Sequence, residues 1–329
     1  MNKYILIVFI GLAAISCRRK GCTSYEAVNF DWKAKIDDGS CLFWAGWDSD
    51  FTPPNGADTT SPDPDHPGRY RLMTAESADG VTIAKTGFVL SDQACEPDVI
   101  SHNDSLFVYY RSWEAGTETD RICVAISRDS EDWIYKHVSL TGYGSGELEG
   151  MRHPDVYKNH DDEFVMNLTV MIDGSWSIIE FISEKGLNFS FSRVLIQEAG
   201  VDHMDSHTFY AHGDFHLFTK DEVDSVHRHF FSENGTDFTD HGTNTFINGG
   251  KGCYVSSSYS DGWFTEIYAY HLPSQHIYTF SSSDADLWSQ VFGTTVDFTG
   301  GLESAYLKDF CRERKENYEY FFVYSTQIP

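Results

Sequence analysis

The stretch "CEPDVISHNDSLFVYYRS" (residues 95–112) has a near copy further along the chain, "RHPDVYKNHDDEFVMNLT" (residues 152–169). Both stretches contain Pro-Asp-Val, then a polar turn, then an apolar run, and they begin 57 residues apart. Recurrence at a period of 20–50 residues or slightly more is typical of repeat architectures, in which each copy builds one supersecondary unit.

The opening of this stretch recurs through the rest of the chain. Five copies begin at steps of 57, 52, 47 and 51 residues, at Glu96, His153, Asp205, Gly252 and Glu303. Each copy leads into a run rich in Val, Ile, Phe, Tyr or Thr, which favours a β-strand.

A second landmark runs in phase with the first. It is a Ser followed, six positions later, by an aromatic or large apolar residue. Its five copies stand at steps of 50, 56, 49 and 50 residues and begin at Ser77, Ser127, Ser183, Ser232 and Ser282. A polar hairpin closed by a packed apolar side chain explains this composition.

Two landmarks, each repeated five times at about 50 residues, predict an all-β fold, a five-bladed β-propeller with one four-stranded sheet per repeat. The fifth copy lacks outer strands, whereas residues 69–91 carry a Ser landmark with no opening strand. We therefore predict that these N-terminal strands complete the last blade and close the ring, which removes exposed sheet edges. Five hairpins arranged as a sandwich are the alternative.

The sequence divides into three parts: residues 1–17, 18–68 and 69–329. The first has a basic residue, a short apolar run and Ser16-Cys17, the pattern of a secretory signal. It resembles a bacterial lipoprotein signal, which implies lipidation at Cys17 and attachment to the cell envelope, on the periplasmic or the surface face of the outer membrane, without a spanning helix. Ordinary secretion is the alternative. The third part is the predicted propeller.

The middle part combines a small module and a linker. Residues 21–42 resemble a short cysteine-bounded module, GCT…DDGSC, of surface proteins from marine Bacteroidetes-type bacteria. An even number of cysteines in an exported chain permits disulfides, and Cys22 with Cys41 is the pairing we expect. The other four cysteines could pair or stay reduced. Residues 52–68, rich in Pro, Asp, Gly and Thr, are typical of a linker or of a long irregular loop.

The net charge restricts the classes of binding partner that the chain can have. With 50 acidic and 24 basic residues the formal charge is −26. A field of this sign repels phosphate backbones, so nucleic acid is not expected as a partner. The acidity also serves solubility, and we expect a monomer.

Innermost strands of a propeller line a central channel, and ligands usually bind near the mouth where those strands begin. Several carboxylates and histidines of the opening landmarks should meet there. Such clusters are commoner at functional sites than elsewhere. The residues expected near this mouth are Glu96, Asp98, Glu149, Arg152, His153, Asp155, His203, Asp205, His207 and Glu303.

Five blades, a carboxylate-Pro opening and the Ser hairpin together resemble the five-bladed propeller glycosidases, glycoside hydrolase family 43 and its relatives, over residues 69–329. The resemblance implies a general base in the first blade, a residue that tunes pKa in the second and a general acid in the third, at Glu96, His153 and Asp205. All three differ from the family's usual Asp, Asp and Glu. Either Asp98, Asp155 or Glu149 takes over a role, or only sugar binding remains.

The candidate catalytic residues are therefore Glu96, Asp98, Asp155 and Asp205, although Asp98 and Asp155 could instead bind backbone amides at the strand starts. Candidate substrate-binding residues are Tyr110, Arg111, Trp113, Glu149, Arg152, His207 and Glu303. His153 and His203 are candidate metal ligands, and some relatives hold calcium in the channel, which suits an oxygen-rich site. We expect a carbohydrate ligand and hydrolysis of a glycosidic bond. A glycan-binding propeller without catalysis and a surface scaffold are the alternatives.

Overall fold

The computed structural model of the chain describes residues 19–24, 33–39, 41, 48–80, 82–114, 119–144, 150–221, 224, 226–244, 253–260, 263–271, 274–295, 307–315 and 319–329. The chain forms two compact units, Met1–Asp48 and Ser49–Pro329. None of the helices in the described ranges has the length and apolarity that crossing a membrane requires. Cys17 and the predicted signal segment lie outside these ranges.

The first unit contains two short strands and a disulfide bond. Strands β1 (Lys20–Gly21) and β2 (Ile36–Asp37) pair in parallel. Cys22 and Cys41 are joined by a disulfide, with their Cα atoms 4.7 Å apart. Because a unit of this size cannot build a large core, a covalent link that restricts the unfolded chain contributes much of its stability. Three further cysteines, Cys95, Cys123 and Cys311, are buried and unpaired.

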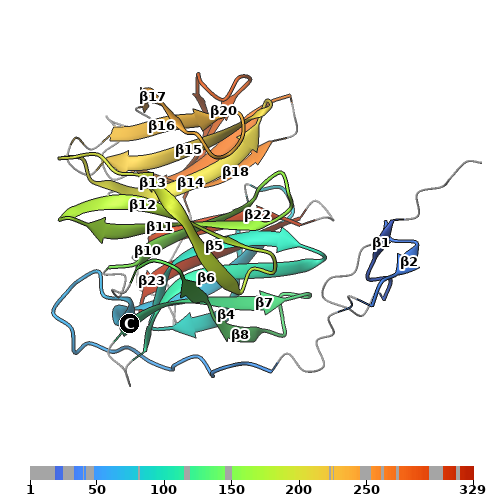
Figure 1. The fold of residues 1–329 in the computed structure, drawn as a ribbon. Coiled ribbons are helices and arrows are strands. Elements are labelled where there is room, and N and C mark those ends of the chain that lie inside the picture. Colours follow the sequence, from blue (N-terminus) through green and yellow to red (C-terminus); the bar gives the residue numbers. More distant parts are fainter. Residues whose placement is uncertain are drawn as a thin grey trace, which may run out of the picture. The chain divides into compact units, whose positions relative to one another are not determined.

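The second unit is the predicted five-bladed propeller, with one antiparallel sheet for each blade (Figure 1). Blade 1 consists of β5 (Ala94–His102), β6 (Ser105–Glu114), β7 (Thr119–Ser127) and β8 (Ile134–His137). Blade 2 consists of β10 (Arg152–Lys158), β11 (Phe164–Ile172), β12 (Ser175–Ser183) and β13 (Asn188–Ile196), and β9 (Ser139–Thr141) pairs with β13 in parallel. Blade 3 consists of β14 (His203–Ala211), β15 (Asp214–Asp221), β16 (Val226–Ser232) and β17 (Thr239–Asn244). Blade 4 consists of β18 (Cys253–Ser260), β19 (Thr265–His271), β20 (His276–Ser282) and β21 (Ser289–Thr295).

The fifth blade confirms the predicted closure of the ring. Its strands, in spatial order, are β22 (Leu307–Arg314), β23 (Tyr320–Gln327), β3 (Tyr70–Ser77) and β4 (Ala84–Asp92), so both ends of the propeller sequence share one sheet. Strand β3 pairs along its whole length with β23, from Tyr70 opposite Gln327 to Ser77 opposite Tyr320. The first strands of successive blades contact one another in the cyclic order β5, β10, β14, β18, β22.

The repeated Ser lies in the same place in every blade, at the turn between the third and fourth strands. Its hydroxyl bonds to the turn that follows. The Ser127 hydroxyl donates to Asp129 at 3.0 Å, and the Gly186 N–H donates to the Ser183 hydroxyl at 3.0 Å. The Ser232 and Ser282 hydroxyls make the equivalent bonds. The landmark is thus a local side-chain-to-backbone turn that fixes how each blade ends.

Gly186 in one of these turns gives a stability prediction. Its φ is +71°, and a Cβ there would lie 2.4 Å from the hydroxyl oxygen of Tyr109 in the neighbouring blade. Because an unfavourable backbone and overpacking add, we expect Gly186→Ala to cost about 3 kcal/mol of unfolding free energy. Gly174→Ala is the matched control, since φ is +82° there but nothing lies within 4 Å of the new Cβ. Its expected cost is about 1 kcal/mol. Urea denaturation measures both, and equal costs would contradict the packing role of Gly186.

The segment before the propeller strands packs on the propeller, as an irregular loop would, which is one of the two alternatives that its composition left open. The compact unit begins at Ser49 rather than at Arg69. The Asp50 carboxylate accepts from Lys136 Nζ at 2.9 Å and from the His137 N–H at 3.1 Å, and Phe51 packs against the apolar core between blades 5 and 1. The short 3-10 helix η1 (Pro67–Arg69) leads into β3. Pro and Asp restrict the conformations of this segment, and side-chain contacts order it.

Candidate active site

Each opening strand of the first three blades carries a β-bulge where the landmark residue stands. The register shifts between Cys95 and Asp98, between Arg152 and Asp155, and between Met204 and His207. The bulged residues Glu96, His153 and Asp205 have φ values of 57°, 48° and 49°. Left-handed backbone at non-glycine residues costs about 1–3 kcal/mol each. Bulges re-aim side chains and are over-represented next to active sites, and here they bring the three side chains together.

His153 lies between the two carboxylates. Its Nδ1 contacts Asp205 Oδ1, and its Nε2 lies 3.7 Å from Glu96 Oε1. The backbone N–H of His153 also donates to Glu96 Oε2 at 3.0 Å. The Glu96 side chain is 1% exposed, whereas those of His153 and Asp205 are 16% and 11% exposed. The three positions that the resemblance selected thus form one cluster, which opens to solvent on the His153 and Asp205 side.

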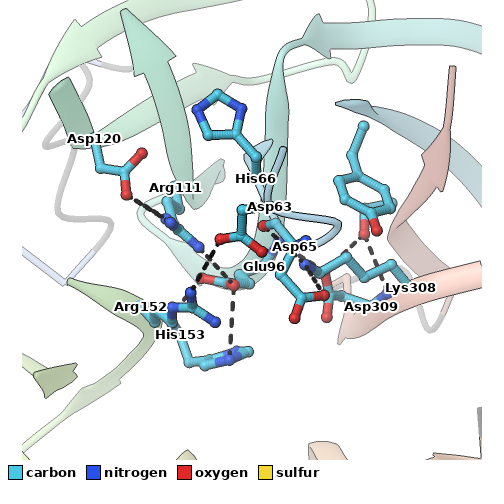
Figure 2. A network of polar contacts seen from close by, with 12 residues as sticks. Asp63, Asp65, His66, Glu96, Arg111, Asp120, Arg152, His153, Lys308 and Asp309 are labelled. Atoms are coloured by element: carbon cyan, nitrogen blue, oxygen red, sulfur yellow. Dashed lines mark hydrogen bonds and ion pairs between the residues drawn. The ribbon is translucent and has the colours of Figure 1, made fainter. Parts of the chain in front are cut away.

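Arg111 neutralises Glu96 from the other side. Its Nη1 lies 3.2 Å from Glu96 Oε1, and its Nε donates to Asp120 Oδ2 at 3.0 Å (Figure 2). The guanidinium is 4% exposed. Arg111 was expected to bind substrate, whereas in the described structure its contacts are with these two carboxylates.

The fifth blade contributes Lys308 and Asp309, which sequence reasoning missed. The bulge of β22 lies between Leu307 and Asp309. The Glu96 N–H donates to Asp309 Oδ2 at 3.0 Å, and the Tyr270 hydroxyl donates to Asp309 Oδ1 at 3.2 Å. Glu303, which was expected to open this strand, and Glu149 lie outside the described residues.

The charges of the cluster follow from its contacts. Burial alone would lower the pKa of His153, but Asp205 and Glu96 raise it to about 9. Burial would raise the pKa of Glu96, but His153 and Arg111 hold it below the usual value. At neutral pH the cluster therefore holds an ionised Glu96 and a protonated His153 imidazole, which lies between the carboxyl groups of Glu96 and Asp205.

Asp98 and Asp155 connect neighbouring blades. Asp98 Oδ2 accepts the Val156 N–H of blade 2 at 2.6 Å. Asp155 Oδ1 accepts the Thr208 N–H of blade 3 at 3.0 Å, and its Oδ2 accepts the Thr208 hydroxyl at 2.7 Å. Glu313 connects blade 5 to blade 1 in the same way, because its Oε1 accepts the Ser101 N–H at 3.1 Å. These contacts match the structural alternative for Asp98 and Asp155. Burial raises the pKa of Asp155 to about 6.

The two histidines proposed as metal ligands do not share a site. His153 is held by the carboxylates described above. His203 is fully buried in blade 3, where its Nδ1 bonds to Thr219 Oγ1 at 3.0 Å and its ring packs edge-on against Phe230. His207 lines the channel, and burial lowers its pKa to about 4. The His153–His203 pair therefore does not fit a metal ion.

The remaining predicted binding residues differ in exposure. Tyr110 is fully buried in the apolar core between blades 5 and 1 and does not line the channel. Trp113 is half-buried, and its Nε1 donates to Asp58 Oδ2 at 3.0 Å. The Arg152 guanidinium lies 5.2 Å from the Trp176 ring centroid and 3.8 Å from Asp63 Oδ2.

Residues 58–66 thus lie beside the charged cluster (Figure 2). Lys308 Nζ contacts the carbonyl oxygen and a carboxylate oxygen of Asp65, both at 3.3 Å, and the His66 ring lies edge-on to Trp113 at 4.3 Å. The sequence analysis did not predict that this segment would lie at the channel mouth.

In the described part of the chain, two cavities are lined by the first strands of the blades, which surround the central channel. The first has a volume of about 40 Å³ and is lined by the bulged residues together with Tyr254, Tyr270 and Asp309. A water molecule needs roughly 10–15 Å³ on this measure, so the cavity admits a few waters rather than a whole sugar. The second, of about 240 Å³, lies beyond Asp98 and His207 and is lined also by Arg312 and Glu313.

Comparison with known proteins identifies the fold. No protein-family model matches the sequence, and no curated protein matches it. Solved structures do match. A thermostable family-43 glycoside hydrolase is 14% identical, with a TM-score of 0.53, over 70% of this chain and 83% of that one. A family 117 glycoside hydrolase of the marine bacterium Zobellia galactanivorans is 10% identical, with a TM-score of 0.52, over 84% and 89%.

A third match is an exo-β-1,3-galactanase variant from Phanerochaete chrysosporium, solved with β-1,3-galactotriose. It is 12% identical, with a TM-score of 0.51, over 79% of this chain and 67% of that one. At these identities the likeness concerns the fold. The chain is a five-bladed β-propeller of the architecture seen in family-43 and family-117 glycoside hydrolases.

Proposed function

We propose that the chain hydrolyses a glycosidic bond in an oligo- or polysaccharide at the mouth of the propeller channel. The observation that carries the proposal is the cluster of Glu96, His153 and Asp205 on three strained bulges. It combines an ionised Glu96 with a protonated His153 that contacts Asp205. Buried charges are costly unless paired, and strained, charged clusters concentrate at functional sites.

Each member of the cluster has a role in this proposal. Glu96 accepts a proton from the water that attacks the anomeric carbon. The protonated His153, which contacts Asp205, gives a proton to the leaving glycosidic oxygen as the C–O bond breaks. Solvent then returns a proton to His153 and removes the proton from Glu96.

The solved structures support a carbohydrate as ligand, since the three compared above are glycoside hydrolases or a galactanase, and one of them holds β-1,3-galactotriose. The predicted lipid anchor at Cys17 would hold the enzyme at the cell envelope, where polysaccharides are met. Metabolic labelling of cells with a radioactive fatty acid tests the predicted lipidation separately. The label should be incorporated into the wild-type protein and not into the Cys17→Ala variant.

Sugar binding without cleavage is the second candidate. The small first cavity favours it, because a sugar ring can enter only if the side chains or the segment 58–66 move. A panel of plant and algal polysaccharides and aryl glycosides, with detection of reducing ends, separates the two functions when a glycan array is run beside it. Sugar release supports hydrolysis. Retention on the array without release from any member of the panel would contradict it and leave a binding protein.

A further inference from the structure

Three side chains at the outer part of blades 3 and 4 form a group apart from the channel. They are His229 on β16, His241 on β17, and Asp286 in the turn between β20 and β21. One ligand atom from each lies within 4.8 Å of the other two. Among the described residues no other group of three or more His, Cys, Asp or Glu side chains meets this criterion.

The backbone aims these residues at one another. The pairing of β16 with β17 shifts between His229 and Phe230, so that His241 is the extra, bulged residue. Asp286 belongs to the Ser282 turn, where its N–H donates to Asp284 Oδ1 at 3.0 Å. His241 Nε2 already contacts Asp286 Oδ1 at 3.0 Å across the two blades.

His229 provides an independent observation that points to a ligand. The residue is 1% exposed, and its ring stacks on Phe218 at 4.5 Å. Its Nε2 bonds to His216 Nδ1 at 3.0 Å, whereas its Nδ1 has no hydrogen-bond partner. Buried polar atoms are normally satisfied, and an orphaned one needs an explanation. A histidine that binds metal through one nitrogen commonly has its other nitrogen hydrogen-bonded to a neighbour, as His216 provides here.

We propose that His229, His241 and Asp286 bind a divalent transition-metal ion, Zn²⁺ in the first place, that links blade 3 to blade 4. Two imidazoles and a carboxylate suit zinc better than calcium, which takes six to eight oxygen ligands. His241 and Asp286 are 41% and 53% exposed, so they can close on the ion, and a water molecule completes the coordination. The proposal does not depend on the function of the channel.

Calorimetric titration of the untagged full chain with ZnCl₂ tests the site. We expect one Zn²⁺ per chain with a micromolar or tighter dissociation constant. Both His241→Ala and Asp286→Asn should weaken binding at least about tenfold, the size of effect that loss of a ligand or its support produces. His160→Ala is the matched control, an exposed histidine whose ring packs edge-on against Tyr210 and Phe215.

Thermal unfolding provides a second readout, since an ion that binds only the folded chain raises the melting temperature. We expect Zn²⁺ to raise it for wild type and His160→Ala but not for His241→Ala. The absence of stoichiometric binding to the wild type, or equal binding by His241→Ala protein that folds normally, would overturn the proposal.

Discussion

His153→Asn is expected to lower the rate of glycoside hydrolysis by at least about 100-fold while the protein stays folded. General acid catalysis contributes about 10²–10⁴-fold, and this variant removes the imidazole that holds the proton with Asp205. Asn tolerates left-handed backbone better than most residues, so the bulge at φ 48° should persist. The backbone N–H that donates to Glu96 is also retained. Initial rates on the substrate identified by the panel measure the effect.

The pH profile distinguishes this role from a structural one. Because the pKa of His153 is raised to about 9, the protonated imidazole persists through neutral pH and is lost as pH rises through about 9. The wild-type rate should therefore fall above about pH 9, not near the usual histidine value of 6.5. Glu96 has a lowered pKa, so it stays ionised below the ordinary 4.5 of a glutamate. A wild-type rate that falls already near pH 6.5 would contradict the contact between His153 and the two carboxylates.

Arg111→Leu is expected to cost about 3–5 kcal/mol of unfolding free energy at pH 7. Removing one member of a buried ion-pair network is strongly destabilising: Glu96, which is 1% exposed, keeps the contact with His153 but loses the guanidinium, and Asp120 loses it as well. Urea denaturation measures the cost, provided that the slope stays unchanged. The double variant Arg111→Leu with Glu96→Leu should regain part of the stability, because the buried glutamate that Arg111 neutralised is removed as well.

Arg121→Leu is the matched control for Arg111. Arg121 stands on the neighbouring strand β7 and contacts Glu114, but the two side chains are 44% and 40% exposed. Exposed pairs contribute about 0–1 kcal/mol. If Arg111→Leu cost no more than Arg121→Leu, the buried cluster would not depend on the guanidinium for its charge balance.

The repeat made most of the fold predictable from sequence. The Ser landmark is a local motif, because its hydroxyl bonds to residues two or three positions later, so it can be recognised without the rest of the structure. The opening landmark depends on Pro-Asp-Val in blades 1 and 2, and it weakens in blades 4 and 5. The period of about 50 residues then selected Glu303, whereas the bulge lies at Lys308.

The site was predictable only in part. The positions of Glu96, His153 and Asp205 follow from equivalent places in successive blades, and the structure brings them together. That Arg111 turns inward to Glu96 depends on the pairing of β5 with β6 and on the bulge, which sequence does not show. The His229, His241 and Asp286 group joins two blades across 57 residues of sequence. No spacing motif in the sequence indicates this group of three side chains.

The measurement that tests the central claim most directly compares sugar release by wild type and Glu96→Gln protein across the same panel, with Glu184→Gln, an exposed glutamate on a turn of blade 2, as the matched control. If Glu96 acts in hydrolysis, wild type and Glu184→Gln should release sugar, and the rate of release should fall at least about 100-fold in Glu96→Gln protein that folds normally. Release that persists unchanged in Glu96→Gln would place the chemistry elsewhere, and no release by wild type would contradict a hydrolytic centre at the channel mouth.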